Sequence, residues 1–543
     1  MIFGKHINKY YLKYLHMLVI GILALLAVDI LQLKVPELYG MVIDGARMGY
    51  VELDGTAVAF DVAFLAEHIC MPLLFVALSL VFGRFLWRVC IFGASMRVEA
   101  DLRREMFKKA KQLSQKFYQR NKVGNLMSLF TNDLSTVQDS FGSGVMMFFD
   151  ALLLGVLAIV KMLRMDYRLT LLALIPMSLL LVIGTVVGKF MREKWRIRQE
   201  AFSSLSDFTQ ENFSGIAVVK AFAKEFLELM RFKRLNRDNE DANVEFTKAS
   251  TLLHVLVTLF VESVICIILG YGGYLVYEGI FTSGELVEFL SYFSSVVWPV
   301  MAVSQLIDMR SRADASLARV SELLDAEVDI ADREGATALE SPSGNIEMRG
   351  LTFRYPDAEC DALCDVSFKI EAGENVGIIG KTGAGKTTLV DLILRIYNVA
   401  DGTLFIDGRD INSLTLDSLR AAVAYVPQDN FLFSDTIENN ICFSAEVTDT
   451  EAARAAAVLA DVDSNISEFS DGYKTLLGER GVTVSGGQKQ RISIARALMK
   501  EAPILILDDS VSAVDTDTER NVINNLKKTR RGRTTILITF LNI

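Results

Sequence analysis

Six long apolar stretches occupy the first 310 residues of the chain, and each has roughly the 20 residues that a helix needs to cross the hydrocarbon core of a bilayer. Hydrophobic residues make up 51% of all 543 residues and the mean hydropathy is +0.32, which is too apolar for an ordinary soluble protein of this size. No small-residue cleavage site follows the first stretch, so we expect it to stay attached as a membrane helix. We therefore predict an α-helical membrane domain with six transmembrane helices, at residues 16–36, 69–92, 141–163, 169–188, 252–277 and 284–305.

The charges between these stretches predict the orientation of the chain in the membrane. Basic residues cluster before the first stretch and after the second and fourth, for example Lys5, Arg103 and Arg196, whereas the other loops are short or acidic. Because basic loops stay in the cytoplasm, we predict a multi-pass protein of the plasma (inner) membrane whose two ends are both cytoplasmic. The formal net charge of −10 says little by itself, and we expect no nucleic-acid partner. The six scattered cysteines are interpreted as free thiols.

The two long cytoplasmic loops, residues 93–140 and 189–251, are predicted to be helical extensions of the membrane helices, because apolar residues recur at helical spacing in them. Breaks at 119–126 and 212–222 mark where helix pairs turn around and face another domain. Beyond the apolar stretches the composition changes, and a polar, small-residue segment separates the two halves. We predict a transmembrane domain at residues 1–325, a linker at 326–344 and a nucleotide-binding domain at 345–543.

A glycine-rich pattern predicts a phosphate site in the second half. The strand-like ENVGIIG runs directly into GKTGAGKTTLVDLILRIY, in which Gly380, Gly383, Gly385, Lys386 and Thr387 fill the pattern G-x-x-x-x-G-K-[ST]. Its glycines let backbone N–H groups close around phosphate, and the start of the following helix adds its positive dipole end. Lys386 is expected to reach the terminal phosphates and Thr387 to bind Mg²⁺. The order strand, glycine-rich loop, helix makes a chance match a poor alternative.

The stretch ILILDD, residues 504–509, reads as a buried strand whose tip presents two carboxylates. A P-loop nucleotide site needs a carboxylate at a strand tip to hold hydrated Mg²⁺, and we assign this role to Asp508. The next position suits a group that orients or polarises the attacking water, and here it is Asp509. The second half is thus predicted to be an α/β P-loop ATPase domain.

The segment VSGGQKQRISIARAL, residues 484–498, resembles the signature of ABC transporters and the helix that follows it. Tyr355 resembles the aromatic residue that stacks on adenine, and Gln428 resembles the glutamine of the Q-loop. GERG (478–481) resembles a segment typical of exporters, and SAVD (512–515) matches the D-loop. With six predicted spans before it, the ATPase domain makes the whole chain similar to a half-size ABC exporter of the multidrug and lipid type.

The resemblance implies ATP and Mg²⁺ as cofactors, and a second ABC half-transporter, the lipid bilayer and a hydrophobic drug, lipid or peptide cargo as partners. It also implies that two ATPase domains pair head to tail, so that the signature of one chain closes on the nucleotide of the other. Catalysis would involve Asp509 and Gln428, and the metal would be bound by Thr387, Gln428 and Asp508. The expected nucleotide-binding residues are Tyr355, Gly380, Lys381, Thr382, Gly383, Ala384, Gly385, Lys386, Thr387, Thr388, Ser485, Gly486, Gly487 and Gln488.

The sequence departs from the family pattern at two positions. The family usually has glutamate where this chain has Asp509, and a histidine at the end of the next strand, where Phe540 stands here. The chain ends at Ile543, so we also expect the domain to be C-terminally truncated. Three interpretations stay open: a degenerate-site subunit of a heterodimeric exporter, a homodimeric exporter in which Asp509 still works, and a truncated, non-functional or regulatory product. The first predicts that the chain's own P-loop binds ATP but hydrolyses it slowly.

Charged residues inside the predicted spans form a second candidate site. Asp29, Arg84, Arg88 and Glu262 fall within or at the edge of the apolar stretches, and charge in a membrane is costly enough to suggest function. They would either snorkel to the interface on helix extensions or line a polar translocation pathway. The sequence leaves both alternatives open.

Overall fold

The computed structural model describes residues 3–53, 56–356, 358–478, 481, 483–510 and 516–540, and the side chains of 177–189 and of Phe540 fall outside this description. The chain divides into two compact units. Unit 1 comprises Met1–Met106 and Met127–Leu324, and unit 2 comprises Phe107–Leu126 and Asp325–Ile543. Unit 2 therefore includes a short piece of chain from within the predicted membrane half.

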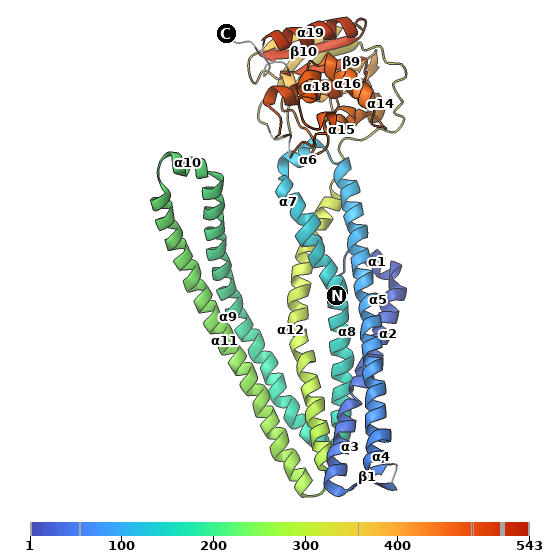
Figure 1. Ribbon diagram of the computed structural model, residues 1–543, viewed down its shortest axis with the longest axis vertical. Helices are drawn as coiled ribbons and strands as arrows, with labels where there is room; N and C mark the ends of the chain where they lie inside the picture. The colour runs from blue at the N-terminus through green and yellow to red at the C-terminus, as the bar shows by residue number, and fades with distance from the viewer. Residues whose placement is uncertain are drawn as a thin grey trace. The chain divides into compact units, whose positions relative to one another are not determined.

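Unit 1 is built from long helices, several of them more than 40 residues in length (Figure 1). A long antiparallel pair, α9 and α11, is joined at its tip by the short α10, and a small hairpin, β1 with β2, follows α3. The helices and strands that lie wholly or largely in this unit are α1 (Asn8–Lys13), α2 (Leu15–Gln32), α3 (Val35–Met48), β1 (Tyr50–Leu53), β2 (Thr56–Ala59), α4 (Val62–Phe64), α5 (Met71–Gln112), α8 (Leu134–Met165), α9 (Tyr167–Ser214), α10 (Ile216–Ala221), α11 (Glu225–Tyr277) and α12 (Ser283–Asp325).

Five of the helical segments in the described residues are long and apolar enough to cross a membrane, and they contain five of the six predicted spans. The remaining span, 169–188, falls on α9, where the side chains of 177–189 lie outside the described residues, so the sixth crossing stays a prediction. The helices extend well beyond the apolar stretches, as their sequence periodicity indicates. Both predicted breaks are present, with α6 (Gln115–Arg120) ending in the extended Asn121 and α10 separating α9 from α11.

Unit 2 contains two sheets. Strands β5 (Asn375–Gly380), β10 (Thr534–Phe540), β9 (Ile504–Asp508) and β8 (Val423–Val426) form a parallel sheet in the order β5-β10-β9-β8. Strands β4 (Leu363–Ile370), β3 (Ile346–Phe353), β6 (Leu404–Ile406) and β7 (Arg409–Asp410) form an antiparallel sheet in the order β4-β3-β6-β7. The helices that lie wholly or largely in this unit are α6, α7 (Val123–Ser128), α13 (Lys386–Ile393), α14 (Leu416–Ala421), α15 (Ile437–Ile441), α16 (Thr450–Leu459), α17 (Asp463–Ser467), α18 (Gly486–Met499) and α19 (Thr516–Thr529).

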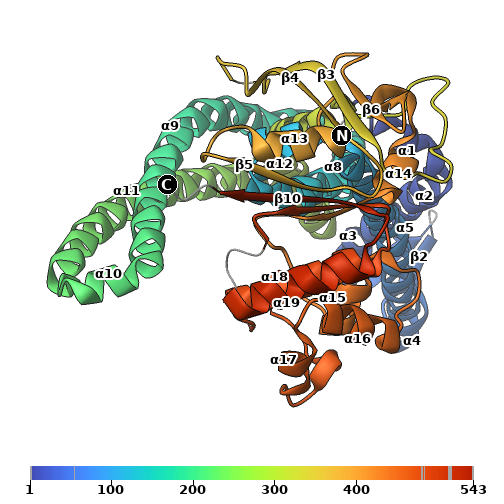
Figure 2. The same ribbon diagram turned by 90° about the horizontal axis from the view of Figure 1, so that it is seen from above.

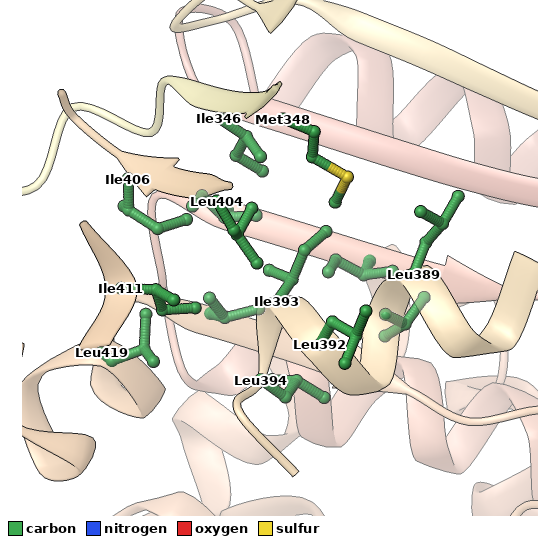
Figure 3. Close-up of a cluster of buried hydrophobic side chains, with 14 of the residues drawn as sticks. Ile346, Met348, Leu389, Leu392, Ile393, Leu394, Leu404, Ile406, Ile411 and Leu419 are labelled. Atoms are coloured by element: carbon green, nitrogen blue, oxygen red, sulfur yellow. The ribbon is translucent and has the colours of Figure 1, made fainter. Parts of the chain in front are cut away.

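The parallel sheet separates two hydrophobic cores. All five residues of β9 are buried, and because side chains alternate along a strand, Ile504 and Ile506 face one core while Leu505 and Leu507 face the other. The first core contains α13 and the antiparallel sheet, and the second contains α15, α16, α18 and α19 (Figure 2). Figure 3 shows α13 contributing Leu389 and Ile393 to the first core. This arrangement fixes α13 and the tip of β9 against each other.

The polar segment 326–344 has no regular helix or strand, and it packs along unit 2. The guanidinium group of Arg395, which is 1% exposed, donates a hydrogen bond to the carbonyl of Ala331 at 2.9 Å. The side chain of Leu339 is buried in the first core of this unit. The segment is therefore held by specific contacts.

Candidate functional site

The loop between β5 and α13 has the backbone that the glycine-rich pattern requires. Gly383 and Gly385 have φ values of +80° and +83°, which lie in the left-handed region that favours glycine. At Gly385 a Cβ atom would lie 2.7 Å from the carbonyl oxygen of Ala362, so a larger residue has no room. The loop thus wraps closely ahead of the first turn of α13, where backbone N–H groups lack helical partners.

Lys386 and Thr387 begin α13 and bring two different groups to this loop. The Nζ atom of Lys386 donates hydrogen bonds to the carbonyl oxygens of Gly380 and Lys381 at 2.8 and 3.0 Å. The hydroxyl of Thr387 donates to Oδ2 of Asp508 at 2.8 Å. The structure therefore joins the glycine-rich loop to the tip of β9, which the sequence predicts only from the separate motifs.

The tip of β9 is held firmly. Asp508 is 2% exposed, and its burial, with the nearby Asp509 carboxylate, raises its pKa, while the Thr387 hydroxyl and Lys386 act in the opposite direction. Asp509 has a φ of +47°. Its N–H donates to the carbonyl of Ile538 at 3.0 Å, and its own carbonyl accepts from the Nε2 atom of Gln490 at 3.0 Å. The backbone at Asp509 is consequently fixed on both sides.

The backbone of Phe540 lies beside that of Gly380 in the β10–β5 register, at the edge of the glycine-rich loop. Its side chain falls outside the described residues. The family resemblance places a histidine at the end of this strand, where Phe540 stands here. The register puts that position next to Gly380, the first residue of the glycine-rich pattern.

An aromatic cluster lies next to the loop. The Tyr355 hydroxyl and the Oγ1 atom of Thr388 are hydrogen-bonded at 2.9 Å, and burial raises the pKa of Tyr355. The Tyr355 ring contacts Phe353 and Tyr397 edge to face, with centroids 5.1 and 5.2 Å apart. Tyr397 in turn donates a hydrogen bond to Oε1 of Gln119 on α6 at 3.0 Å. Sequence reasoning missed Tyr397 and Gln119, because no local pattern connects residues so far apart.

The signature segment starts α18 with a capping box. Ser485 is the N-cap: its hydroxyl accepts from the N–H of Gln488 at 3.3 Å, and the Gln488 side chain accepts from the N–H of Ser485 at 3.0 Å. Ser485 and Gly486 are exposed. The start of this helix is therefore ordered and open to a ligand or partner.

Three predicted features of the site remain: Gln428, the D-loop and the GERG segment. Gln428 follows β8 and its side chain is exposed. The D-loop residues 512–515 and, within GERG, Glu479 and Arg480 lie outside the described residues.

Asp391, on α13, is a residue near the site that was not predicted. Its burial, followed by the charge of Asp508, raises its pKa to about 6. Asp391 lies four residues after Thr387 and so shares a face of α13 with it. This spacing can be read from the sequence alone.

Comparison with known proteins decides the family. Residues 18–300 match the family described as the ABC transporter transmembrane region, and residues 363–512 match the family described as ABC transporter. The chain belongs to the ABC transporters. An ABC ATPase domain binds ATP, and its fusion to a membrane domain identifies a transporter that couples ATP hydrolysis to transport. This ABC transporter is a multi-pass membrane protein with a cytoplasmic ATPase domain, and as a half-transporter it acts together with another half-transporter.

Several relatives cover nearly all of this ABC transporter. A probable multidrug resistance ABC transporter ATP-binding/permease protein, YheI, of Bacillus subtilis is 35% identical, covering 99% of this chain and 89% of YheI. The multidrug resistance-like ATP-binding protein MdlA of Escherichia coli is 34% identical, covering 95% and 86%. The ATP-dependent lipid A-core flippase of Syntrophus aciditrophicus is 35% identical, covering 88% and 80%.

The fold is similar to that of a bacterial Atm1-family ABC exporter solved with ATP bound. The two chains align with a TM-score of 0.75 and 25% sequence identity over 98% of this chain and 91% of the other. The predicted fold class, a helical membrane domain followed by an ABC-type ATPase domain, is therefore confirmed. The predicted C-terminal truncation stays a prediction.

Proposed function

We propose that this chain is the degenerate-site half of a heterodimeric exporter in the plasma (inner) membrane, moving hydrophobic or amphipathic drugs, lipids or peptides. The names of YheI and MdlA support drugs as cargo, and the name of the flippase supports a lipid. In this proposal residues 1–325 form the transmembrane domain, 326–344 the linker and 345–543 the nucleotide-binding domain. The chain's own P-loop binds ATP with Mg²⁺ and turns it over slowly.

The donor groups around the glycine-rich loop fit a nucleotide with Mg²⁺. Mg²⁺ prefers oxygen ligands and is usually bound by one or two carboxylates together with substrate phosphates. Thr387 Oγ1 and Asp508 Oδ2 supply such oxygens, and Gln428 is the further ligand in our assignment. Among the described residues no cluster of three or more His, Cys, Asp or Glu side chains can hold a metal by itself, which suits an ion shared with phosphates. When bound, Mg²⁺ would neutralise charge on the phosphates.

The protein groups have separate tasks in this proposal. Backbone N–H groups of residues 380–388 surround the phosphates, and Lys386 leaves its loop carbonyls to reach the terminal phosphate. Tyr355 presents its ring to adenine. Gln428 and Asp509 position the attacking water. Positioning and electrostatic stabilisation supply most of the rate acceleration in phosphoryl transfer, so small displacements of these groups matter.

The observation that carries the proposal is the fixed backbone at Asp509. Aspartate is one methylene shorter than glutamate, so its carboxylate is withdrawn by about 1.5 Å, one C–C bond. Hydrogen bonds to Ile538 and from Gln490 hold the backbone on both sides, so the chain cannot move forward to compensate. A displacement of about 1 Å can reduce a rate roughly a hundredfold.

The signature segment supports ATP hydrolysis at the second composite site, the one that contains the partner's P-loop. Ser485 is ordered by its capping box, and the exposed N–H groups at the start of α18 suit the terminal phosphate of a partner's ATP. In this arrangement the productive site consists of the partner's P-loop and Ser485, Gly486, Gly487 and Gln488 of this chain.

Paired variants in the reconstituted complex test the proposal. The chain is purified alone and with a candidate second half-transporter, and ATP hydrolysis is measured for Lys386→Ala and Ser485→Arg in this chain. We expect Lys386→Ala to retain at least half of the turnover of the complex and Ser485→Arg to lose at least 90% of it. Vigorous hydrolysis and transport by the chain alone would instead establish a homodimeric exporter.

The length of the Asp509 side chain is tested directly in the chain alone. We expect Asp509→Glu to raise ATP turnover at least tenfold, because it returns the carboxylate toward the water. Asp417→Glu, at an exposed position on α14, is the matched control for the added methylene and should leave turnover unchanged. An Asp509→Glu variant no faster than wild type would show that side-chain length does not limit hydrolysis.

A further inference from the structure

A cavity of about 410 Å³ lies within unit 1, between α2, α5, α8 and α12. Its volume falls in the range that holds a small organic molecule. Apolar walls come from Leu25, Val28 and Leu154, and two indole rings, Trp87 and Trp298, also line it. The cavity therefore offers aromatic and aliphatic surface inside the membrane domain.

Two carboxylates from different helices line the same cavity. Asp29 on α2 is 2% exposed, and its Oδ2 atom has no hydrogen-bond partner among the described residues. Asp150 on α8 accepts a hydrogen bond from the indole Nε1 of Trp298 at 2.8 Å. The buried indole N–H of Trp87 also has no partner among the described residues. A carboxylate buried without a counter-charge is costly, so Asp29 favours a cationic group at its side.

Two arginines also line the cavity, and each contacts a neutral side chain. Arg84 donates to Oε1 of Gln32 at 3.2 Å, and the Arg88 guanidinium lies 5.4 Å from the centroid of the Trp87 ring. Both arginines are exposed, in contrast to Asp29. The partners of both arginines are neutral, and Arg84 acts electrostatically on Asp150, so the lining as a whole is not negative. The buried carboxylate that lacks a hydrogen-bond partner among the described residues is Asp29.

We infer that this cavity is a cargo subsite that selects organic cations with an apolar body, and that Asp29 is its specificity-determining residue. The inference rests on the proposed export function and adds the charge class of the cargo. Asp29 binds the cationic centre, and Asp150 lies in the same cavity with Arg84 and Trp298 as its partners. The face of Trp298 attracts the same cation, because an aromatic ring is negative over its face, whereas Arg88 already lies over the Trp87 ring. This gives the intramembrane carboxylate a role in recognition.

Binding of two ions of matched shape tests the inference without ATP hydrolysis. The full chain, alone and with its partner, is placed in lipid nanodiscs, and binding of tetraphenylphosphonium and of tetraphenylborate is measured with empty nanodiscs subtracted. We expect wild type to bind the cation more tightly than the anion. Asp29→Asn should weaken cation binding at least tenfold, and Asp29→Glu should keep it within about threefold because the charge remains.

Glu262→Gln is the matched control, because Glu262 is an exposed intramembrane carboxylate on α11 that does not line the cavity. It should bind the cation as wild type does. Equal cation binding by wild type and Asp29→Asn, or tighter binding of the anion by wild type, would overturn the inference. Since no nucleotide is present, either result leaves the slow-site proposal to be decided by its own ATPase measurements. A folded Asp29→Asn protein is verified by its ATP binding.

Discussion

Gly385 and Gly402 share a left-handed backbone conformation but have different surroundings. Comparing them separates the effect of backbone strain from the effect of having no room for a Cβ atom. Gly385 has a φ of +83° and faces the carbonyl of Ala362, which is held in place because the Ala362 N–H donates to the carbonyl of Phe353 at 2.8 Å. Gly402 has a φ of +76°, and no atom lies within 4 Å of the position that a Cβ atom would take there. Any L-residue is strained at both positions, but only Gly385 also lacks room for a Cβ atom.

We predict that Gly385→Ala lowers ATP affinity at least tenfold, because the new Cβ atom must push the glycine-rich loop away from Ala362. Gly402→Ala should cost about 1 kcal/mol of stability from backbone strain alone and leave ATP affinity unchanged. Equilibrium binding of a fluorescent ATP analogue, together with thermal unfolding of both variants, checks this. Equal loss of ATP affinity in the two variants would show that backbone strain, rather than lack of room for a Cβ atom, weakens ATP binding.

At the scale of elements, α6 belongs by its contacts to the unit that holds the nucleotide site. It is one helical turn and a half long and has no buried residue of its own. Its link to that unit includes the hydrogen bond from Tyr397 to Gln119, and Tyr397 also packs against Tyr355. A change at Tyr355 therefore has a short contact path to α6 through Tyr397.

We predict that Tyr397→Phe loosens α6 while leaving the aromatic packing intact. Loss of one hydrogen bond is worth about 1 kcal/mol, so hydrogen–deuterium exchange in residues 115–120 should accelerate about threefold to tenfold. Tyr355→Phe removes a hydroxyl that bonds Thr388 instead, and it is the control that should leave exchange at α6 unchanged. Unchanged exchange in Tyr397→Phe would show that the hydrogen bond to Gln119 does not hold α6.

At the scale of the whole molecule, the charge asymmetry of the loops predicts which parts face the cytoplasm. The hairpin β1–β2 lies between the first two predicted spans, on the side with few basic residues. Cys360 and Cys364 are exposed thiols of unit 2. The hairpin and these two thiols should therefore lie on opposite sides of the membrane.

We predict that Ala57→Cys, at an exposed position of β2, reacts with a membrane-impermeant maleimide in intact cells. Cys360 and Cys364 should react only after the cells are made permeable. Mass spectrometry of the labelled peptides checks both. The reverse pattern would invert the orientation that the loops predict.

The sequence by itself determined the features that depend on neighbouring residues. Apolar length predicts the membrane spans, the glycine pattern predicts the strand, loop and helix at residues 375–393, and the signature predicts the helix start at Ser485. These signals are local, because helix periodicity, capping and left-handed φ values are set within a few residues.

Only the tertiary structure decided which distant residues meet. The hydrogen bond from Thr387 to Asp508 joins residues 121 positions apart, and the one from Tyr397 to Gln119 joins residues 278 positions apart. Asp29 and Asp150 line one cavity because α2 and α8 pack together. Such contacts depend on sheet register and helix packing, which a single sequence does not encode in any local pattern.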